Sequence, residues 1–164
     1  MKTLVLVRHA KSSWKYPKLD DFERPLNKRG RKNAPMMGKI LRQLKVKPDL
    51  IISSPANRAA MTSRIIADMI HYPLVNIQYD ESIYLSGEMD LMHILIDLDD
   101  GIKEVMLVGH NPELTLLANT LGNDSISNIP TSGIFCLDFD ISAWSKIETS
   151  PGELKFFEFP KKHS

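Results

Sequence analysis

The sequence of 164 residues contains one cysteine, no long hydrophobic run and a net charge of only +1. A single cysteine, Cys136, cannot form an internal disulfide, which excludes a small secreted scaffold held together by disulfides. The first apolar run, residues 4–7, is broken by Arg8 and His9. It is too short for the hydrophobic region of a signal peptide or for a membrane span. We therefore expect a soluble, cytoplasmic protein with no membrane partner.

The composition favours an ordered globular protein. Hydrophobic residues make up 43% of the chain and charged residues 25%, which argues against intrinsic disorder. A chain of this length fits one compact domain with a substantial core. No internal repeat, low-complexity segment or linker is apparent, so we expect a single domain over residues 1–164.

The small net charge conceals a marked asymmetry along the chain. Residues 1–47 contain 14 Lys and Arg against 3 Asp and Glu, whereas residues 48–164 contain 7 against 17. This separation favours an anionic ligand near the first third of the chain. Nucleic acid is a weak candidate, because the basic residues are not interleaved with aromatic ones and no nucleic-acid-binding module is present. Four of the basic side chains are better explained as the solvated face of a helix: Lys39, Arg42, Lys45 and Lys47.

Apolar periodicity predicts strands that alternate with helices. The expected strands are residues 2–7, 49–53, 75–78, 104–108, 134–139 and 154–159. The expected helices are residues 27–46, 54–70, 88–98 and 113–121, with Asn27 and Ser54 as the N-caps of the first two. Residues 10–26 are polar and form a long loop. The alternation predicts an α/β fold, a three-layer sandwich in which helices flank a mostly parallel central sheet.

Cationic and imidazole side chains follow three of the predicted strands. Arg8 and His9 follow the strand at 2–7, Arg58 lies just after the strand at 49–53, and His110 follows the strand at 104–108. In open α/β sheets, ligands bind beyond the carboxyl ends of the strands, so we expect these side chains to share one edge of the sheet. Two helix N-termini would point to the same edge and add partial positive charge.

These residue types are suited to a phosphoryl group. Guanidinium groups bind phosphate oxygens in pairs, and a neutral imidazole is a competent nucleophile near neutral pH. His9 could thus carry a phosphoryl group covalently while Arg8, Arg58 and His110 stabilise its charge. Because fixed cations would supply the positive field, we expect no metal and no cofactor.

The same residues resemble a known family. Arg8-His9-Ala10 is similar to the Arg-His-Gly signature of the histidine phosphatase superfamily, with alanine in place of glycine. Residues 53–59 and 108–112 resemble its second-arginine and second-histidine segments. Arg24-Pro25-Leu26, followed by Gly30, resembles a segment of the SixA-type phosphohistidine phosphatases, which are small, single-domain bacterial enzymes. The motifs lie between positions 8 and about 112 in the order of the family.

The resemblance implies a phosphoglycerate-mutase-like fold and a role for each matched residue. His9 would be the phosphorylated nucleophile, and Arg8, Arg58 and His110 would complete the phosphate pocket. Arg24 and Asn111, which lie in matched segments, are expected to help bind substrate. Glu81 stands where the family places its general acid, with Asp21 of the long loop as the alternative. Thr131-Ser132-Gly133 is expected to border the pocket.

The main hypothesis is a metal-independent phosphatase that acts on protein phosphohistidine or on another accessible phosphate monoester or phosphoramidate. Only about fifty residues separate Arg58 from His110, which leaves little chain for a lid over a small metabolite. An open pocket would suit a phosphorylated protein, with basic residues near its mouth: Lys11, Lys15, Lys28 and Arg29. The oligomeric state stays open.

Three other interpretations are compatible with parts of the sequence. One is a phosphoglycerate-mutase-like phosphotransferase that acts on a small metabolite. Another is a phospho-ligand binding module without turnover, although mere binding needs no nucleophilic histidine. A third, weak one is a nucleic-acid binder that uses the basic first third of the chain. Asp97-Leu98-Asp99 only imitates the nucleophile motif of haloacid-dehalogenase-type phosphatases. That motif belongs at a strand end, whereas here it follows a helical pattern and predicts a helix end and a turn.

Overall fold

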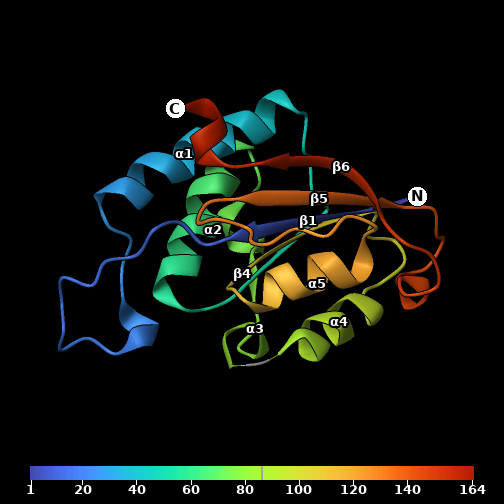
Figure 1. The fold of residues 1–164 in the computed structure, drawn as a ribbon, viewed down its shortest axis with the longest axis horizontal. Helices are drawn as coiled ribbons and strands as arrows, with labels where there is room; N and C mark the ends of the chain where they lie inside the picture. The colour runs from blue at the N-terminus through green and yellow to red at the C-terminus, as the bar shows by residue number, and fades with distance from the viewer. Residues whose placement is uncertain (86) are drawn as a thin grey trace.

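A six-stranded mixed sheet forms the centre of the protein (Figure 1). The computed structural model describes residues 1–85 and 87–164. The strand order is β3-β2-β4-β1-β5-β6; the pairs β1–β4, β4–β2 and β2–β3 are parallel, whereas β5 is antiparallel to β1 and β6 to β5. This arrangement confirms the expected α/β fold with a mostly parallel central sheet. The strands are β1 Lys2–Arg8, β2 Leu50–Ser53, β3 Gln78–Tyr79, β4 Glu104–Gly109, β5 Ile134–Phe139 and β6 Glu153–Glu158.

Helices cover both faces of this sheet. The α-helices are α1 Lys28–Gln43, α2 Asn57–Met69, α3 Ser82–Leu85, α4 Glu88–Ile96 and α5 Glu113–Leu121. Apolar residues of α1 and α2 pack on one face, and those of α4 and α5 pack on the other (Figure 1). Within the residues that the structure describes, no helix is both long enough and apolar enough to cross a membrane.

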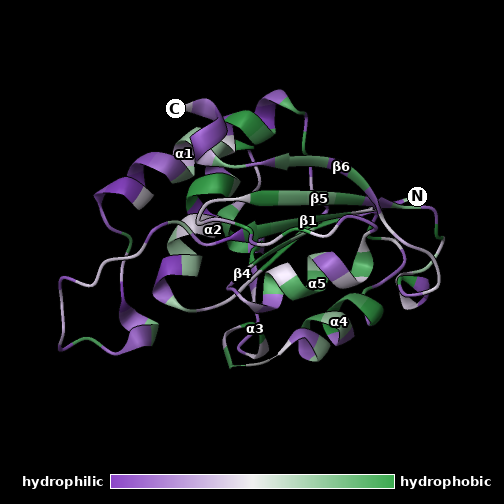
Figure 2. Cartoon of the chain, in the orientation of Figure 1, coloured by the Kyte–Doolittle hydropathy of each residue, from purple (hydrophilic) through white to green (hydrophobic). Residues whose placement is uncertain are grey.

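The central strand β1 is buried on both faces. Leu4 and Leu6 belong to the core formed with α4 and α5, whereas Val5 and Val7 belong to the core formed with α1 and α2. All four side chains are fully buried. This position explains why the run from 4 to 7 is apolar without polar alternation. Figure 2 shows the resulting hydrophobic colour along the central strands.

The N-cap of α1 is as predicted, but the start of α2 is not. The Asn27 carboxamide accepts a hydrogen bond from the Gly30 N–H at 2.8 Å and caps α1. The predicted start of α2 at Ser54 is wrong: α2 begins at Asn57, with Ala56 at the N-cap position. The Ser54 hydroxyl does accept the Ala56 N–H at 3.2 Å, but the chain turns for two more residues before the helix begins.

The strand predicted over residues 75–78 is displaced. Leu74–Asn76 forms a 3-10 turn, and the strand comprises only Gln78–Tyr79. Val75 is 93% exposed, so its β-branched side chain has no core surface to pack against. The short helix α3 was not predicted. As expected, Asp97 ends α4, and the Asp99 carboxylate accepts the Gly101 N–H in a turn.

The long loop of residues 10–26 is closed at its base. The Ser13 N–H donates to the Pro25 carbonyl at 2.8 Å, and the Asn27 N–H donates to the Lys11 carbonyl at 2.9 Å. Asp21–Glu23 forms a 3-10 turn inside this loop. In Figure 1 the loop projects from the body at the left, beyond the carboxyl end of β1.

Gly30 permits α1 to approach this loop base closely, which generates a stability prediction. A Cβ atom at position 30 would overlap the carbonyl oxygen of Lys11. Gly30→Ala should therefore destabilise the protein by about 1–3 kcal/mol, although alanine is the better helix former. Urea unfolding tests this expectation. Lys32→Ala, at an exposed position of the same helix, should change stability by less than about 0.5 kcal/mol. An unchanged or increased stability of Gly30→Ala would contradict the close approach.

Candidate active site

The carboxyl ends of three neighbouring strands meet beside His9. The His9 N–H donates to the carbonyl of Gly109, the last residue of β4, at 3.1 Å. The Ser54 N–H, directly after β2, donates to the Val108 carbonyl at 2.9 Å. The rings of His9 and His110 come within 5.2 Å of each other, centroid to centroid. The fold thus brings together side chains that lie about a hundred residues apart in the sequence.

The His9 ring is buried and held in one orientation. Its exposed fraction is 8%, and its Nδ1 lies 2.7 Å from the Ala10 carbonyl oxygen. A carbonyl oxygen only accepts hydrogen bonds, so Nδ1–H is the donor and Nε2 retains its lone pair. The Ser132 N–H donates to the His9 carbonyl at 3.1 Å and holds the main chain from the other side. Ser132 therefore borders the site, as expected.

Both histidines are neutral at physiological pH. Burial lowers the pKa of His9 to about 3, and the nearby His110, Arg58 and Arg8 disfavour a further positive charge. Burial also lowers the pKa of His110 to about 4, with Arg58 as the next contribution. A neutral imidazole with a free Nε2 lone pair is a nucleophile. The lowered pKa values therefore keep His9 in its reactive form.

The two arginines are each anchored through part of their guanidinium group. Arg8 Nη1 donates to the Ile129 carbonyl at 3.0 Å. Arg58 Nη1 donates to the Asp21 carbonyl at 2.7 Å, and its Nη2 donates to the Asp21 carboxylate at 3.0 Å. Burial lowers the pKa of Arg8, but an arginine stays charged at neutral pH. The anchors fix two positive charges next to neutral rings.

Four buried polar atoms around His9 have no hydrogen-bond partner within residues 1–85 and 87–164. They are Arg8 Nε, Arg58 Nε, His110 Nδ1 and Ser132 Oγ. Buried polar atoms are almost always paired in folded proteins, because an unpaired one loses its hydration without compensation. Both Nε–H groups are donors, and the hydroxyl can donate as well. Such a set of atoms matches the needs of an anionic ligand with several oxygens.

His110 is held by two residues outside the predicted set of site residues. Its Nε2 lies 2.7 Å from the Ser54 hydroxyl, and the Tyr84 ring contacts it edge-on at 5.6 Å between centroids. The sequence context of Ser54 indicates only a helix cap, and no motif marks Tyr84. The contact of Tyr84 depends on α3, a four-residue helix without a clear sequence signal.

Asp21 joins the long loop to the site. Its carboxylate accepts hydrogen bonds from Arg58, Arg24 and the Tyr84 hydroxyl, the last at 2.7 Å. Partial burial alone would raise its pKa. The hydrogen bond from Tyr84 and the charge and hydrogen bonds of the two arginines outweigh it and lower the pKa to about 2. A carboxyl group with this pKa has no proton to donate at neutral pH, which argues against Asp21 as the general acid.

Glu81 is exposed on the segment just before α3. Its main-chain carbonyl accepts the N–H groups of Tyr84 and Leu85. Its carboxylate makes no hydrogen bond within the part of the chain that the structure describes. The structure therefore places Glu81 three residues from Tyr84 but does not bring its carboxylate into hydrogen-bond contact with His9 or His110.

Arg24 and Asn111 support the loops that flank the site. Arg24 is buried and donates to the Ser12 hydroxyl at 2.7 Å and to Asp21. The Asn111 carboxamide donates to the Asn128 side chain and to the Ile129 carbonyl, the group that also anchors Arg8. The expectation that these two residues bind substrate directly stays a prediction.

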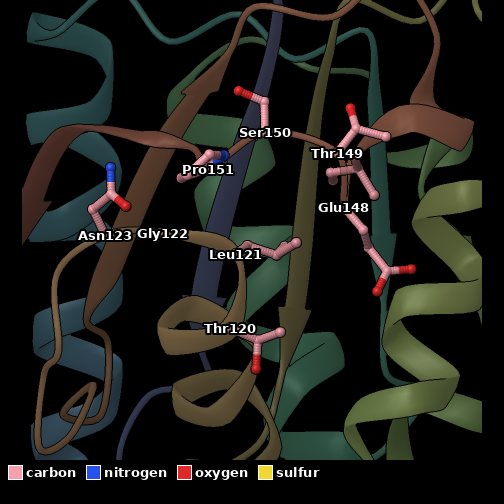
Figure 3. A pocket seen from close by; sticks show the side chains of 9 residues that line it. Thr120, Leu121, Gly122, Asn123, Glu148, Thr149, Ser150 and Pro151 are labelled. Carbon is pink, nitrogen blue, oxygen red and sulfur yellow. The ribbon is translucent and has the colours of Figure 1, made fainter.

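A separate cavity of about 260 Å³ lies at the far end of α5. It is lined by the end of that helix and by the connection before β6, including Leu121, Glu148 and Pro151 (Figure 3). His110 precedes the opposite end of α5, so this cavity is not an extension of the site around His9. Among the described residues, no three His, Cys, Asp or Glu side chains lie together in a way that could hold a metal ion.

Comparisons with known proteins agree with this geometry. The family model of the Histidine phosphatase superfamily (branch 1) matches residues 4–83. An uncharacterized protein of Mycobacterium tuberculosis is 30% identical over 94% of this chain and 100% of its own length. An uncharacterized chloroplastic protein of Arabidopsis thaliana is 33% identical over 76% of this chain, which spans 61% of that relative's length.

Two solved structures resemble nearly the whole chain. A protein of Agrobacterium tumefaciens, assigned as the phosphohistidine phosphatase SixA, is 28% identical, covers 97% of this chain and 98% of its own, and has a TM-score of 0.82. The protein histidine phosphatase SixA complexed with tungstate is 20% identical, covers 99% of each chain and has a TM-score of 0.84. The second likeness concerns the fold alone.

The fold, the motifs at the three strand ends and these comparisons define the class of protein. The chain belongs to the histidine phosphatase superfamily. Within it, the chain is of the SixA type, with the phosphoglycerate-mutase-like fold, and it is a phosphatase.

The lowered pKa values of the two histidines predict a loss of stability on mild acidification. In the unfolded chain a histidine titrates near pH 6.5, whereas His110 and His9 titrate at about 4 and about 3 in the fold. The unfolded chain thus takes up protons first, so this stability is complete above about pH 6.5 and is lost as the pH falls towards the folded values. The stability that Asp21 adds at neutral pH is lost only at lower pH, between the usual pKa of about 4 for an aspartate and its pKa of about 2 in the fold.

Urea unfolding at about pH 7 and about pH 5 measures this effect. The free energy of unfolding should fall less between the two pH values in His9→Gln than in the unmodified protein. His93→Gln, which removes an exposed ring on α4, should retain the original pH dependence. Equal slopes in all three proteins would contradict the burial of a neutral His9.

Proposed function

We propose that the protein is a metal-independent phosphatase that acts through a phosphohistidine intermediate on His9, with a protein-borne phosphohistidine as its preferred substrate. The observation that carries the proposal is the free Nε2 of a buried, neutral His9 among unpaired donors of Arg8, Arg58 and Ser132. This arrangement supplies a nucleophile and a positive field in one place.

In the first step, the His9 Nε2 lone pair attacks phosphorus. A bond forms between Nε2 and phosphorus, and the bond from phosphorus to the leaving nitrogen or oxygen breaks. Arg8 and Arg58 stabilise the charge on the equatorial oxygens, which is the main requirement of phosphoryl transfer. The Ala10 carbonyl accepts Nδ1–H and stabilises the positive charge that develops on the His9 ring.

In the second step, water attacks the phosphorus of phosphohistidine. The bond between phosphorus and Nε2 breaks, inorganic phosphate forms, and the lone pair returns to Nε2. The water loses one proton in this step. His110 can accept it at Nδ1 in the tautomer whose Nε2–H donates to the Ser54 hydroxyl, because Nδ1 then has a lone pair and no partner within the described chain. Neither step needs a metal ion, because two fixed guanidinium groups supply the positive charge.

A protein substrate is favoured by the short connections around the site. Between Arg58 and His110, the described chain is taken up by α2, β3, α3, α4 and β4 and their turns, which leaves no inserted lid. A phosphorylated side chain on a protein surface can enter such a site, whereas a small metabolite would be poorly enclosed. The Agrobacterium tumefaciens structure carries the name of a phosphohistidine phosphatase, which supports the same substrate class. Neither nucleic acid nor a membrane is part of this proposal.

Trapping the phosphoenzyme tests the proposed nucleophile. Incubation with phosphohistidine and excess EDTA should give turnover and an acid-labile, alkali-stable phosphoenzyme. His9→Ala should abolish both, because it removes the nitrogen that attacks phosphorus. Asp99→Ala, in a turn after α4, should behave like the unmodified protein. Loss of activity in Asp99→Ala with normal turnover in His9→Ala would overturn the assignment, as would complete inhibition by EDTA.

A leaving-group series tests Glu81 as the general acid. An aryl or alkyl phosphate needs a proton on its departing oxygen, whereas a departing imidazole needs less assistance. Glu81→Gln should therefore lower kcat for an alkyl phosphate by about 100-fold and lower kcat for phosphohistidine much less. Asp21→Asn should not show this dependence on leaving group, because Asp21 is ionised already. Equal losses on both substrates in Glu81→Gln would exclude the acid role.

A further inference from the structure

The tip of the long loop carries an unusual group of exposed side chains. We call residues 13–20 the arm. Trp14 is 75% exposed, Tyr16 52% and Leu19 43%. Lys15 and Lys18 lie between them in the sequence and are exposed as well. The arm projects beyond the carboxyl end of β1 (Figure 1). Scattered exposed apolar residues are ordinary, but a tryptophan, a tyrosine and a leucine within six residues of one loop point to an interaction surface.

Trp14 is exposed yet fixed in position. The Arg24 guanidinium lies 3.6 Å from the centre of the Trp14 ring. Arg24 itself is buried and held by the Ser12 hydroxyl and the Asp21 carboxylate. A stacked cation orders one face of the indole and leaves much of the ring open to a partner. Because little conformational freedom remains to be lost, binding through Trp14 carries a small entropic penalty.

The arm is also connected to the phosphate site. Asp21 accepts hydrogen bonds from Arg24 on the side of the arm and from Arg58 on the side of His9. Trp14 is thus joined to Arg58 through two consecutive side chains. A phosphorylated residue bound at His9 and a protein surface bound at Trp14 would therefore be neighbours on the same partner.

Charge indicates the kind of partner. The arm has two lysines, and Lys11 at its base and Lys28 and Arg29 at the start of α1 are exposed on the adjoining chain. Two exposed carboxylates, Asp20 and Glu23, lie in or next to the arm, whereas Asp21 is ion-paired with Arg24 and Arg58. The five exposed basic side chains still outnumber these two carboxylates. An acidic protein surface complements this set of charges, and an apolar contact on that surface would cover the indole.

We propose that residues 13–20 form a recognition arm that docks the acidic surface surrounding the phosphorylated residue of a protein substrate, with Trp14 as its apolar anchor. This inference rests on the proposed phosphatase function and adds a determinant of substrate choice. The arm contributes to substrate binding and not to the chemical step, so its loss should raise KM and leave kcat unchanged.

Three synthetic probes test the arm. The first is a peptide with one phosphohistidine among Glu and Leu residues, the second has Lys in place of Glu, and the third is free phosphohistidine. The unmodified protein should prefer the acidic peptide. The double variant Lys15→Glu/Lys18→Glu should lower kcat/KM for the acidic peptide by about tenfold, through KM, and leave free phosphohistidine within about twofold.

Matched variants separate docking from general effects of charge or folding. Lys39→Glu/Arg42→Glu reverses two exposed charges on α1, away from the arm, and should leave kcat/KM for the acidic peptide unchanged. Trp14→Ala should raise KM for the acidic peptide, whereas Trp14→Phe keeps an aromatic ring on Arg24 and should retain most of the affinity. Turnover of free phosphohistidine by each variant shows that the site is folded.

Each outcome distinguishes the arm from the underlying function. If the protein hydrolyses free phosphohistidine but treats the acidic and basic peptides equally, and Lys15→Glu/Lys18→Glu changes nothing, the arm proposal is overturned and the phosphatase proposal stands. If no probe is hydrolysed, the proposed function itself fails. Competition by a single-stranded RNA oligonucleotide that depends on Lys15 and Lys18, together with indifference to the acidic peptide, would assign the arm to nucleic acid instead.

Discussion

The chemistry of this protein depends on the way the main chain holds His9 at the end of the central strand. The His9 N–H is bound to the Gly109 carbonyl, the His9 carbonyl receives the Ser132 N–H, and the ring nitrogen Nδ1 is bound to the Ala10 carbonyl. These contacts leave the ring little freedom to rotate and leave the lone pair on Nε2. The roles proposed for Arg8, Arg58 and His110 all depend on this fixed position of the His9 ring.

Within the part of the chain that the structure describes, the Asp21 carboxylate balances part of the positive charge beside that ring. Arg8 and Arg58 are the positive charges beside two neutral histidines. Asp21, on the long loop, partly offsets this positive charge through its ion pair with Arg58. The same carboxylate receives the Tyr84 hydroxyl and so fixes the residue whose ring touches His110. The charges of the long loop and of the phosphate site are therefore coupled, and Tyr84 of α3 takes part through its hydrogen bond to Asp21. The Nε–H groups of Arg8 and Arg58 have no hydrogen-bond partner within the described residues and are left for an anionic ligand.

Much of this arrangement could be predicted from the sequence, because it follows from strong local patterns. The apolar runs predict the buried strands, and the rule that ligands lie beyond the carboxyl ends of parallel strands is enough to bring Arg8, His9, Arg58 and His110 to one edge. The Asn27 cap is likewise a local signal. The start of α2 was missed because the Ser54 hydroxyl fits both a helix cap and a partner for the His110 ring.

The contacts that could not be predicted join segments without periodicity. Tyr84 reaches Asp21 from 63 positions away, and no pattern in either segment encodes that hydrogen bond. The ionisation of Asp21 depends on this pairing, so its poor fit as a proton donor became apparent only in three dimensions. The expected role of Glu81 rests on the family resemblance, because its exposed carboxylate makes no hydrogen bond within the described residues that would mark it as part of the site.

The permanent positive charge of the site resides on guanidinium groups, and this has a consequence for the environment in which the protein can work. Arginine does not lose its proton over the range in which cells operate, and the two rings beside it gain none there. The positive charge with which the site attracts anions therefore stays the same when the surroundings become moderately more acidic or more alkaline. Any pH dependence of the activity within that range must come from the ionisation of the incoming phosphate or of groups other than these arginines and histidines.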